Sequence, residues 1–349
     1  MPLLEKVVTR SASDLHLTEG LPPMMRLNKR LVPLGNEVLI PRDIEAAVNQ
    51  LVPEKNAKEL SETGSSDFGY SFSPKARFRV SVYRQKGGLS MAMRLIPSRL
   101  LTMEEIGLPS MIKPVLRKNQ GLVIVTGPTG SGKTTTLASM IDFINTDLDR
   151  HILTIEDPIE YYHDHKRSII TQREIGTDVP SFPEALRRGL RQDPDVILVG
   201  EMRDNDTIAT AITAAETGHL VLGTLHTTGS TRTMDRIIDT FSPDYQEHIR
   251  SQLASSIEAV ISQILLPRAD GNGLVAAFEV MTRTPAVENH IRKSETFKIT
   301  TVIQTSRKHG MTLLDDSICK LVQSGQVTLE AALAAAQNPA DLYTKFGDS

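Results

Sequence analysis

Four short apolar runs occur in the middle of the chain, and each is too short to form a typical helix. They are Leu122–Thr126, Ile152–Ile155, Val196–Val199 and Leu220–Gly223. Nearly every position in these runs is apolar, which is typical of strands that are covered on both faces in a parallel sheet. Helical patterns alternate with the runs. We therefore expect residues 114–284 to form an α/β core around a largely parallel sheet.

The two ends of the chain have different patterns. Residues 1–98 mix short strand-like runs with one helical stretch, Pro41–Leu60, and are predicted to form a smaller N-terminal domain. Residues 285–349 show only helical periodicity, which predicts a helical C-terminal subdomain. Between the first domain and the core, residues 99–113 carry Pro109 and mixed charges, and we expect this segment to be a linker.

Alternating polar and apolar residues on both sides of Lys86-Gly87 predict a β-hairpin. If these two residues form its loop, the register places Arg79 directly opposite Arg94. Like charges that face each other across two strands are unfavourable unless an acid or an anion lies between them. The pair is therefore either a clamp for phosphate or two arginines on a solvated sheet face, paired with an acid such as Asp67 or Glu62. Spacing alone favours the second interpretation.

Composition limits the class of protein. The chain has 349 residues, with 39 Lys and Arg against 42 Asp and Glu, and this length allows two or three domains. No apolar run approaches the ~18 residues of a membrane-spanning helix, and the N-terminus lacks the apolar core of a signal peptide. The single cysteine, Cys319, excludes an internal disulfide and a multi-cysteine zinc site. The slightly acidic balance argues against a protein that coats nucleic acid. We expect a soluble cytoplasmic enzyme.

One segment matches the phosphate-binding pattern G-x-x-x-x-G-K-[ST] in full. It consists of Gly127, Pro128, Thr129, Gly130, Ser131, Gly132, Lys133, Thr134 and Thr135. A predicted buried strand precedes the segment and a predicted helix follows it, which is the context in which this pattern binds nucleotides. Glycines allow backbone N–H groups to surround phosphate, Lys133 reaches the β- and γ-phosphates, and the Thr134 hydroxyl binds Mg²⁺. The sequence therefore predicts a site for a nucleoside triphosphate with Mg²⁺.

Two predicted strands end in acidic residues. Glu156 follows Ile152–Ile155, and Glu201 follows Val196–Val199 after one intervening glycine, Gly200. The carboxyl ends of neighbouring parallel strands lie at the edge of the sheet where a phosphate loop also lies. We expect Glu201 to support Mg²⁺ through water, as a metal-site residue, and Glu156 to orient or deprotonate the attacking water. The two roles could be exchanged.

A histidine, His226, lies just past the end of the run Leu220–Gly223. A residue at this position could sense the γ-phosphate through a hydrogen bond that is lost on hydrolysis. A single histidine is more often structural, so its position alone leaves the sensor role as the minority interpretation.

Several separate motifs together resemble the secretion ATPases of type II secretion and type IV pili. In addition to the phosphate loop, Ile155–Glu160 resembles the aspartate box of the family, and Leu190–Asp204 contains the two parts of its Walker B segment. Thr217–Thr227 resembles its histidine box, and Ala12–Leu17 matches near the N-terminus. The resemblance covers nearly the whole chain, with four motifs in the order of the family.

The resemblance implies a fold and an assembly. It implies a RecA-like P-loop core and a homo-hexameric ring, in which a PAS-like N-terminal α+β domain packs against the neighbouring subunit's core. It supports Glu156 and Glu201 as catalytic acids and makes His226 the favoured sensor. It also assigns the role of arginine fingers to Arg79 and Arg94.

Within the family, the resemblance favours the branch that retracts pili. The tetracysteine zinc insertion of the extension and secretion motors is absent, which favours retraction. Ala286–Arg292 departs from the C-terminal signature of the retraction motors and retains only part of it. We therefore expect an ATPase at the inner face of the cytoplasmic membrane that acts on the pilus inner-membrane platform protein. Paralogous motor subunits are further candidate partners, membrane association is expected only through partners, and no direct contact with nucleic acid is expected. The alternatives are an extension or type II secretion ATPase, a RecA-like DNA motor and a non-catalytic accessory paralogue.

Overall fold

The computed structural model describes all residues except 1, 11, 28–29, 74–75, 97–98 and 347–349. The chain divides into two units, Met1–Leu100 with Pro158–Tyr162, and Leu101–Asp157 with His163–Ser349. Most of the segment expected to be a linker is counted with the second unit. There Met103, Leu108 and Ile112 are buried among apolar side chains of the core. Over these residues the segment is packed on the core and is not an exposed connection.

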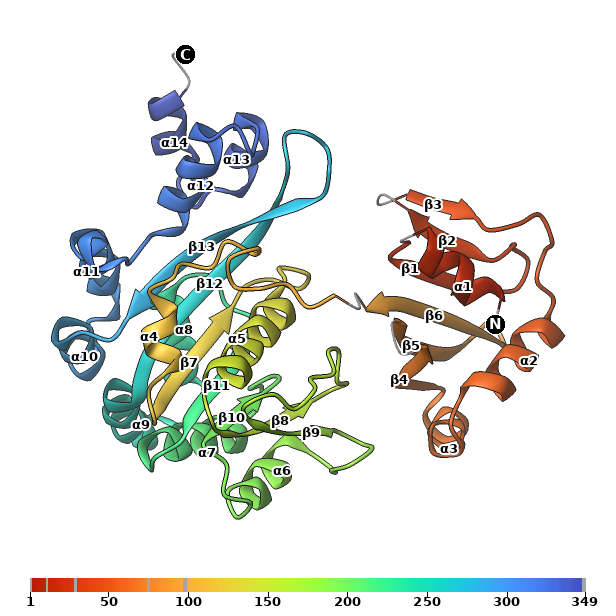
Figure 1. The fold of residues 1–349 in the computed structure, drawn as a ribbon, viewed down its shortest axis with the longest axis horizontal. Coiled ribbons are helices and arrows are strands. Elements are labelled where there is room, and N and C mark those ends of the chain that lie inside the picture. The colour runs from red at the N-terminus through yellow and green to blue at the C-terminus, as the bar shows by residue number, and fades with distance from the viewer. Residues whose placement is uncertain (1, 11, 28–29, 74–75, 97–98, 347–349) are drawn as a thin grey trace. The chain divides into compact units, whose positions relative to one another are not determined.

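An antiparallel sheet organises the first unit, with its strands in the order β3-β2-β1-β6-β5-β4 (Figure 1). The bounds are α1 Pro2–Thr9, β1 Asp14–Leu17, β2 Met24–Leu27, β3 Arg30–Pro33, α2 Pro41–Leu51, α3 Glu54–Thr63, β4 Ser65–Ser73, β5 Ala76–Gln85 and β6 Gly88–Ile96. Alternate residues of β5 and β6, among them Phe78, Val80 and Met93, are fully or almost fully buried. They pack with apolar residues of the helices, so one face of the sheet forms the core of this unit.

The predicted hairpin is confirmed in its register. Arg79 pairs with Arg94, and the loop between β5 and β6 consists of Lys86 and Gly87. Their φ angles are 48° and 83°, which is the left-handed backbone of the two-residue loops that join twisted strands.

The prediction of a single helix over Pro41–Leu60 was wrong. The segment forms two helices, α2 and α3, separated at Val52 and Pro53. Proline has no N–H to donate within a helix, and its ring disfavours helical backbone in the preceding residue. Val52 accordingly has extended backbone, and α3 begins only after Pro53.

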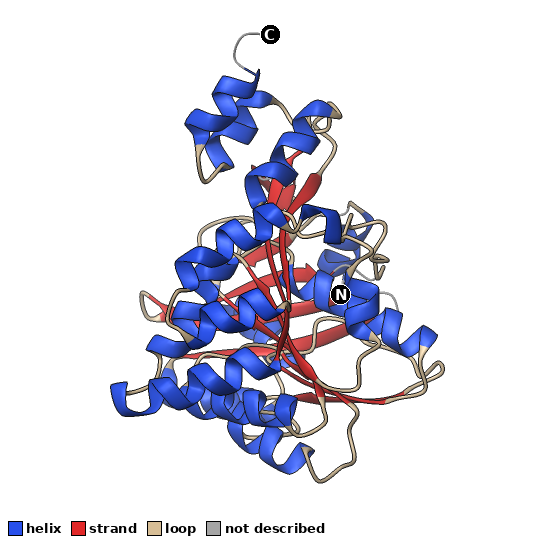
Figure 2. Cartoon of the chain, turned by 90° about the vertical axis from the view of Figure 1, so that its left-hand side faces the viewer, coloured by secondary structure: helices blue, strands red, loops and turns tan. Residues whose placement is uncertain are grey.

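A seven-stranded sheet organises the second unit, in the order β13-β12-β7-β11-β10-β8-β9 (Figure 1). Its strands are among those drawn in red in Figure 2. The bounds are α4 Ile112–Leu116, β7 Gly121–Thr126, α5 Lys133–Asp147, β8 His151–Glu156, β9 Ile169–Glu174, α6 Phe182–Gly189, β10 Val196–Val199, α7 Asn205–Glu216, β11 Leu220–Leu225, α8 Ser230–Asp239, α9 Pro243–Ser256, β12 Ile257–Pro267 and β13 Leu274–Thr282. Only β13 pairs antiparallel, with β12; the other neighbours are parallel. All four predicted strands are present, whereas β9, β12 and β13 were not predicted.

Both faces of this sheet are buried, as the apolar runs predicted. In β7, Leu122 and Ile124 join an apolar cluster with α6, α7, α8 and α9, whereas Val123 and Val125 join a second cluster with α4 and α5. Successive strand residues point to opposite faces, so one run of apolar residues supplies two cores.

The chain after β13 is helical, as predicted. Its elements are α10 Pro285–Arg292, η1 Thr296–Lys298, α11 Ile299–Thr305, η2 Arg307–His309, α12 Leu314–Gln323, α13 Leu329–Ala335 and α14 Pro339–Phe346. The last three helices share a small core with the ends of β12 and β13. Cys319 lies in this core, and burial raises the pKa of its thiol. Among the described residues, no helix is long and apolar enough to cross a membrane.

Candidate nucleotide-binding and catalytic site

The phosphate loop connects the end of β7 to the first turn of α5 (Figure 1). Gly127, Gly130 and Gly132 have φ angles of 148°, 78° and 86°, which side chains strongly disfavour. At Gly127 a Cβ atom would also lie 2.2 Å from the backbone oxygen of Gln263 in β12. The loop is therefore compatible only with glycine at this position, and it presents the N-terminus of α5, a favourable end for an anion.

The side chain of Lys133 is folded back over its own loop. Its Nζ donates hydrogen bonds to the backbone oxygens of Gly127 at 2.9 Å and Pro128 at 3.1 Å, and the residue is 9% exposed. Burial lowers the pKa of the ammonium group, while the negative charge of Glu201 acts in the opposite direction. The predicted phosphate ligand and the predicted acid therefore influence each other within one site.

The carboxylate of Glu201 contacts two side chains. One belongs to His226, which is distant in sequence, and the other to Arg203, to which the sequence analysis gave no role. His226, directly after β11, places Nε2 3.0 Å from Oε1 of Glu201. Arg203 donates to the same oxygen from Nε, and this hydrogen bond raises the pKa of the guanidinium group. The structure thus brings together Glu201 and His226. Arg203 was missed as a candidate, although it lies only two residues beyond Glu201.

The second acid, Glu156, ends β8 beside the end of β10. Its Oε1 accepts hydrogen bonds from Thr154 Oγ1 at 2.6 Å and Gln172 Nε2 at 3.3 Å. At Gly200, directly after β10, the backbone approaches β8 closely, since a Cβ there would lie 3.1 Å from the backbone oxygen of Ile155. Glycine in this position therefore allows the chain just after β10 to lie against the end of β8.

The two arginines of the hairpin lie in the first unit, whereas the phosphate loop and both acids lie in the second. Arg94 donates from Nε to Oδ1 of Asp14 at 2.9 Å, yet its side chain remains 70% exposed. Burial raises the pKa of Asp14, but hydrogen bonds from Ser13 and Arg94 outweigh this effect and leave it below its ordinary value. Arg79 is also exposed.

The expectation that Asp67 or Glu62 would pair with these arginines was wrong. Asp67 lies opposite Ser81 in the sheet, and Glu62 pairs with Lys58. Arg94 instead pairs with Asp14, which β1 places directly opposite it across the β1–β6 pair. This contact depends on a strand pairing between residues far apart in the chain.

Sequence reasoning also missed Gln263, a polar residue that supports the phosphate loop. Gln263 lies in β12, is 1% exposed, and donates from Nε2 to the backbone oxygen of Ser131 at 2.5 Å. The signal that could have revealed it is a single amide within the apolar run Ile257–Pro267. A buried polar side chain in a strand normally has a specific hydrogen-bonding partner.

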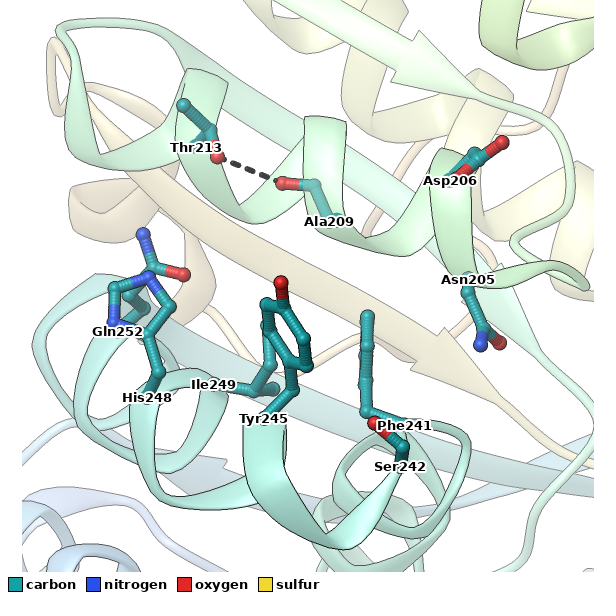
Figure 3. A pocket seen from close by; sticks show the side chains of 10 residues that line it. All are labelled: Asn205, Asp206, Ala209, Thr213, Phe241, Ser242, Tyr245, His248, Ile249 and Gln252. Atoms are coloured by element: carbon teal, nitrogen blue, oxygen red, sulfur yellow. Dashed lines mark hydrogen bonds between the residues drawn. The ribbon is translucent and has the colours of Figure 1, made fainter.

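A groove of about 410 Å³ lies elsewhere in the second unit, between α7 and α9 (Figure 3). It is lined by Asn205, Asp206, Ala209, Thr213, Phe241, Ser242, Tyr245, His248, Ile249 and Gln252. None of the predicted nucleotide-site residues lines this groove, so it is separate from the phosphate loop and its acids.

A phosphate loop between β7 and α5, with carboxylates at the ends of the adjacent strands β8 and β10, defines a P-loop nucleotide-binding protein. Comparison with known proteins narrows this class. Residues 70–334 match the model of the family described as Type II/IV secretion system protein. The chain belongs to this family.

Curated relatives are similar along nearly the whole chain. The type IV pilus retraction ATPase PilT of Pseudomonas aeruginosa is 45% identical over 97% of this chain and 98% of its own length. The twitching motility protein of Neisseria gonorrhoeae is also 45% identical, over 90% of this chain and 84% of its own. The type IV pilus ATPase PilU of P. aeruginosa is 38% identical, over 97% and 89%.

Solved structures share the mixed α/β fold. The crystal structure of the pilus retraction motor PilT with bound ADP superposes with a TM-score of 0.90, at 41% identity and 98% coverage of both chains. The ATPase DotB of Legionella pneumophila gives a TM-score of 0.81 at 28% identity, covering 96% of this chain and 95% of its own. The fold and the family agree with an ATPase.

Proposed function

We propose that the chain is an ATP-hydrolysing motor that powers retraction of type IV pili, as in twitching motility. The observation that carries this proposal is the 45% identity with a pilus retraction ATPase over 97% of the chain. The site supports it, because Lys133 and Glu201 interact beside a complete phosphate loop. The extension, secretion and DNA-motor alternatives lack an observation of this strength.

The phosphate loop would bind the triphosphate through its backbone N–H groups. Lys133 would exchange its two contacts with loop carbonyls for the β- and γ-phosphates. The Thr134 hydroxyl and, through water, the Glu201 carboxylate are oxygen donors, which fit the preference of Mg²⁺. When bound, Mg²⁺ neutralises charge on the phosphate oxygens.

Hydrolysis requires a group that directs water at the γ-phosphorus. We assign this role to Glu156, whose Oε1 is oriented by hydrogen bonds from Thr154 and Gln172. Water would attack the γ-phosphorus as its proton passes to this carboxylate, and the bond to the β-phosphate oxygen would break. His226 would report loss of the γ-phosphate to Glu201, and the 3.0 Å distance between the two side chains supports this role. An exchange of roles between Glu156 and Glu201 is the alternative assignment.

For the assembly, we propose a homo-hexameric ring with a RecA-like second unit and a PAS-like first unit. In such a ring the exposed Arg79 and Arg94 of one subunit would supply positive charge to the nucleotide of its neighbour. The ring would act at the inner face of the cytoplasmic membrane on the platform protein of the pilus. Paralogous motor subunits are further candidate partners.

The test combines enzymology and imaging. Purified wild type should hydrolyse ATP, and Glu201→Ala should lower kcat about 100-fold or more. The control is Asp270→Ala, which changes an exposed acid in the loop before β13 and should leave kcat at the wild-type value. Cells that lack the protein should accumulate unretracted pili. Loss of pili would indicate an extension motor, and DNA-stimulated hydrolysis would indicate a DNA motor. Absence of hydrolysis by the wild type would indicate an accessory subunit.

A further inference from the structure

The loop 226–229, between β11 and α8, is attached at its end to two strands that are distant in sequence. The backbone N–H of Gly229 donates to Ser262 Oγ at 2.9 Å. One residue later, Ser230 donates twice to Oε1 of Glu279, from its backbone N at 2.6 Å and from Oγ at 2.8 Å. The position at which this loop ends is therefore set by side chains of β12 and β13.

The two side chains that accept these hydrogen bonds are both buried, and they are neighbours. Ser262 and Glu279 lie directly opposite each other in the β12–β13 pair, and they are 0% and 4% exposed. A buried carboxylate is costly to desolvate unless hydrogen bonds and favourable charge surround it. Glu279 has both kinds of stabilisation. Ser230 donates two hydrogen bonds to it, and Ser230 lies at the N-terminal end of α8, where the helix dipole is positive.

The next residue of β12 serves the other loop of the site. Gln263 donates to the backbone oxygen of Ser131 at 2.5 Å and so holds the phosphate loop. Consecutive side chains of a strand point to opposite faces. Strand β12 thus supports the phosphate loop from one face and, through Ser262, the histidine-bearing loop from the other.

We infer that Glu279 is a positioning residue for ATP hydrolysis. Through Ser230 it fixes the end of loop 226–229, and the loop in turn holds His226 at 3.0 Å from Glu201. The inference rests on the proposed ATPase function and deepens it. Glu279 itself touches neither Glu201 nor the phosphate loop in its described contacts, so its effect passes through His226.

The inference predicts a particular kinetic signature. Glu279→Ala should lower kcat about 10- to 100-fold, as small displacements of catalytic groups do, while KM for ATP stays within about twofold. The KM should be spared because Gln263 still holds the phosphate loop. Glu279→Gln retains an oxygen that accepts hydrogen bonds from Ser230 and should recover most of kcat.

The decisive measurement is a double-mutant cycle with His226→Ala. If Glu279 acts through His226, adding Glu279→Ala to His226→Ala should change kcat by no more than about twofold. Independent, multiplicative losses would overturn the inference. Wild type without ATPase activity would instead overturn the proposed function, so the two failures are distinguishable.

A matched control comes from the same strand pair. Glu258 is equally buried, 4% exposed, but lies at the start of β12, where it pairs with Lys118 and Arg283. Glu258→Ala should lower the thermal unfolding temperature, and any loss of kcat should multiply with that of His226→Ala. All variants are compared per folded molecule, by binding of a fluorescent ADP analogue. If Glu279→Ala does not fold, Ser230→Ala replaces it in the cycle: non-additive losses would support the inference and multiplicative losses would overturn it.

Discussion

The candidate residues of the two units are held in very different ways. In the second unit, Lys133 is 9% exposed and bonded to its own loop, and Glu201 contacts His226. In the first unit, the side chain of Arg94 is 70% exposed and has Asp14 as a partner for one nitrogen. The candidate side chains of the second unit are therefore buried or paired with one another, whereas the hairpin presents its positive charge to the solvent.

This difference indicates a division of labour. Groups that bind a ligand benefit from burial and fixed hydrogen bonds, because less reorganisation is needed on binding. Two arginines opposed across a ladder repel each other, and an anion brought from outside relieves that repulsion. We therefore expect changes in the phosphate loop of the second unit to affect nucleotide binding, and changes in the hairpin to affect turnover alone.

The strongest test of this division is removal of the arginines. Arg94→Ala and Arg79→Ala should each lower kcat about 1,000-fold, as loss of an arginine finger does, while the affinity for ADP stays unchanged. Arg84→Ala, an exposed arginine at the end of the same strand β5, is the control and should retain activity. The measurement is ATPase rate beside ADP binding. A wild-type kcat in Arg94→Ala would contradict the proposed role of the hairpin.

A second test concerns the backbone of the phosphate loop. Gly127→Ala should destabilise the protein by about 3 kcal/mol or more, because its Cβ would overlap the backbone of β12. Gly130→Ala has the same unfavourable sign of φ but open space around its Cβ, so about 1 kcal/mol is expected. Urea unfolding measures both. Equal losses would show that contact with β12 does not constrain the loop.

A third test uses the pH dependence of nucleotide binding. Burial lowers the pKa of Lys133 below its ordinary value of 10.5, and a charged ammonium group is needed to bind phosphate. ADP affinity should therefore be full at pH values below that lowered pKa and should fall, by up to about tenfold per pH unit, once the pH exceeds it. Lys133→Arg keeps its charge and should show no such fall. Parallel profiles for the two proteins would contradict the assignment.

The smallest expected effect concerns the acid beside the hairpin. The pKa of Asp14 is lowered in the folded state, so the unfolded chain binds the proton more readily. The contribution of this carboxylate, about 1 kcal/mol, should be present at neutral pH and should be lost as the pH falls below about 4. Asp14→Asn should lack it at every pH, whereas Asp67→Asn, an exposed acid of β4, should behave as wild type. Urea unfolding at pH 7 and pH 3 compares them.

Short-range patterns in the sequence were enough to predict much of the architecture. The alternation around Lys86-Gly87 was enough for the correct register of β5 and β6, because hairpin pairing depends on neighbours in sequence. The four apolar runs and the phosphate loop were also predictable, since burial on both faces and the need for glycine leave direct marks in the sequence. The apolar spacing of Pro41–Leu60 suits a single helix, but Pro53 has no N–H to donate and separates α2 from α3.

The supporting contacts were not predictable in the same way. Gln263 and Glu279 act on residues more than forty positions away, and those partners meet only after β12 pairs with β7 and β13. The strands themselves had a signal that was overlooked, because two apolar runs flank the turn-forming segment Asp270–Gly273. The hydrogen-bonding partners of Gln263 and Glu279 depend on tertiary packing. A single sequence has no periodic pattern that would reveal such partners.

The burial of Cys319 has a practical consequence for following this molecule at work. It is the only thiol in the chain, it is 7% exposed, and its raised pKa leaves little reactive thiolate at neutral pH. Maleimide reagents should therefore label an engineered surface cysteine selectively in the otherwise native protein. A cysteine at position 84 of the hairpin and another on an exposed helix of the second unit would accept a donor and an acceptor dye. Changes in the separation of the two units during a turnover cycle could then be recorded on single molecules.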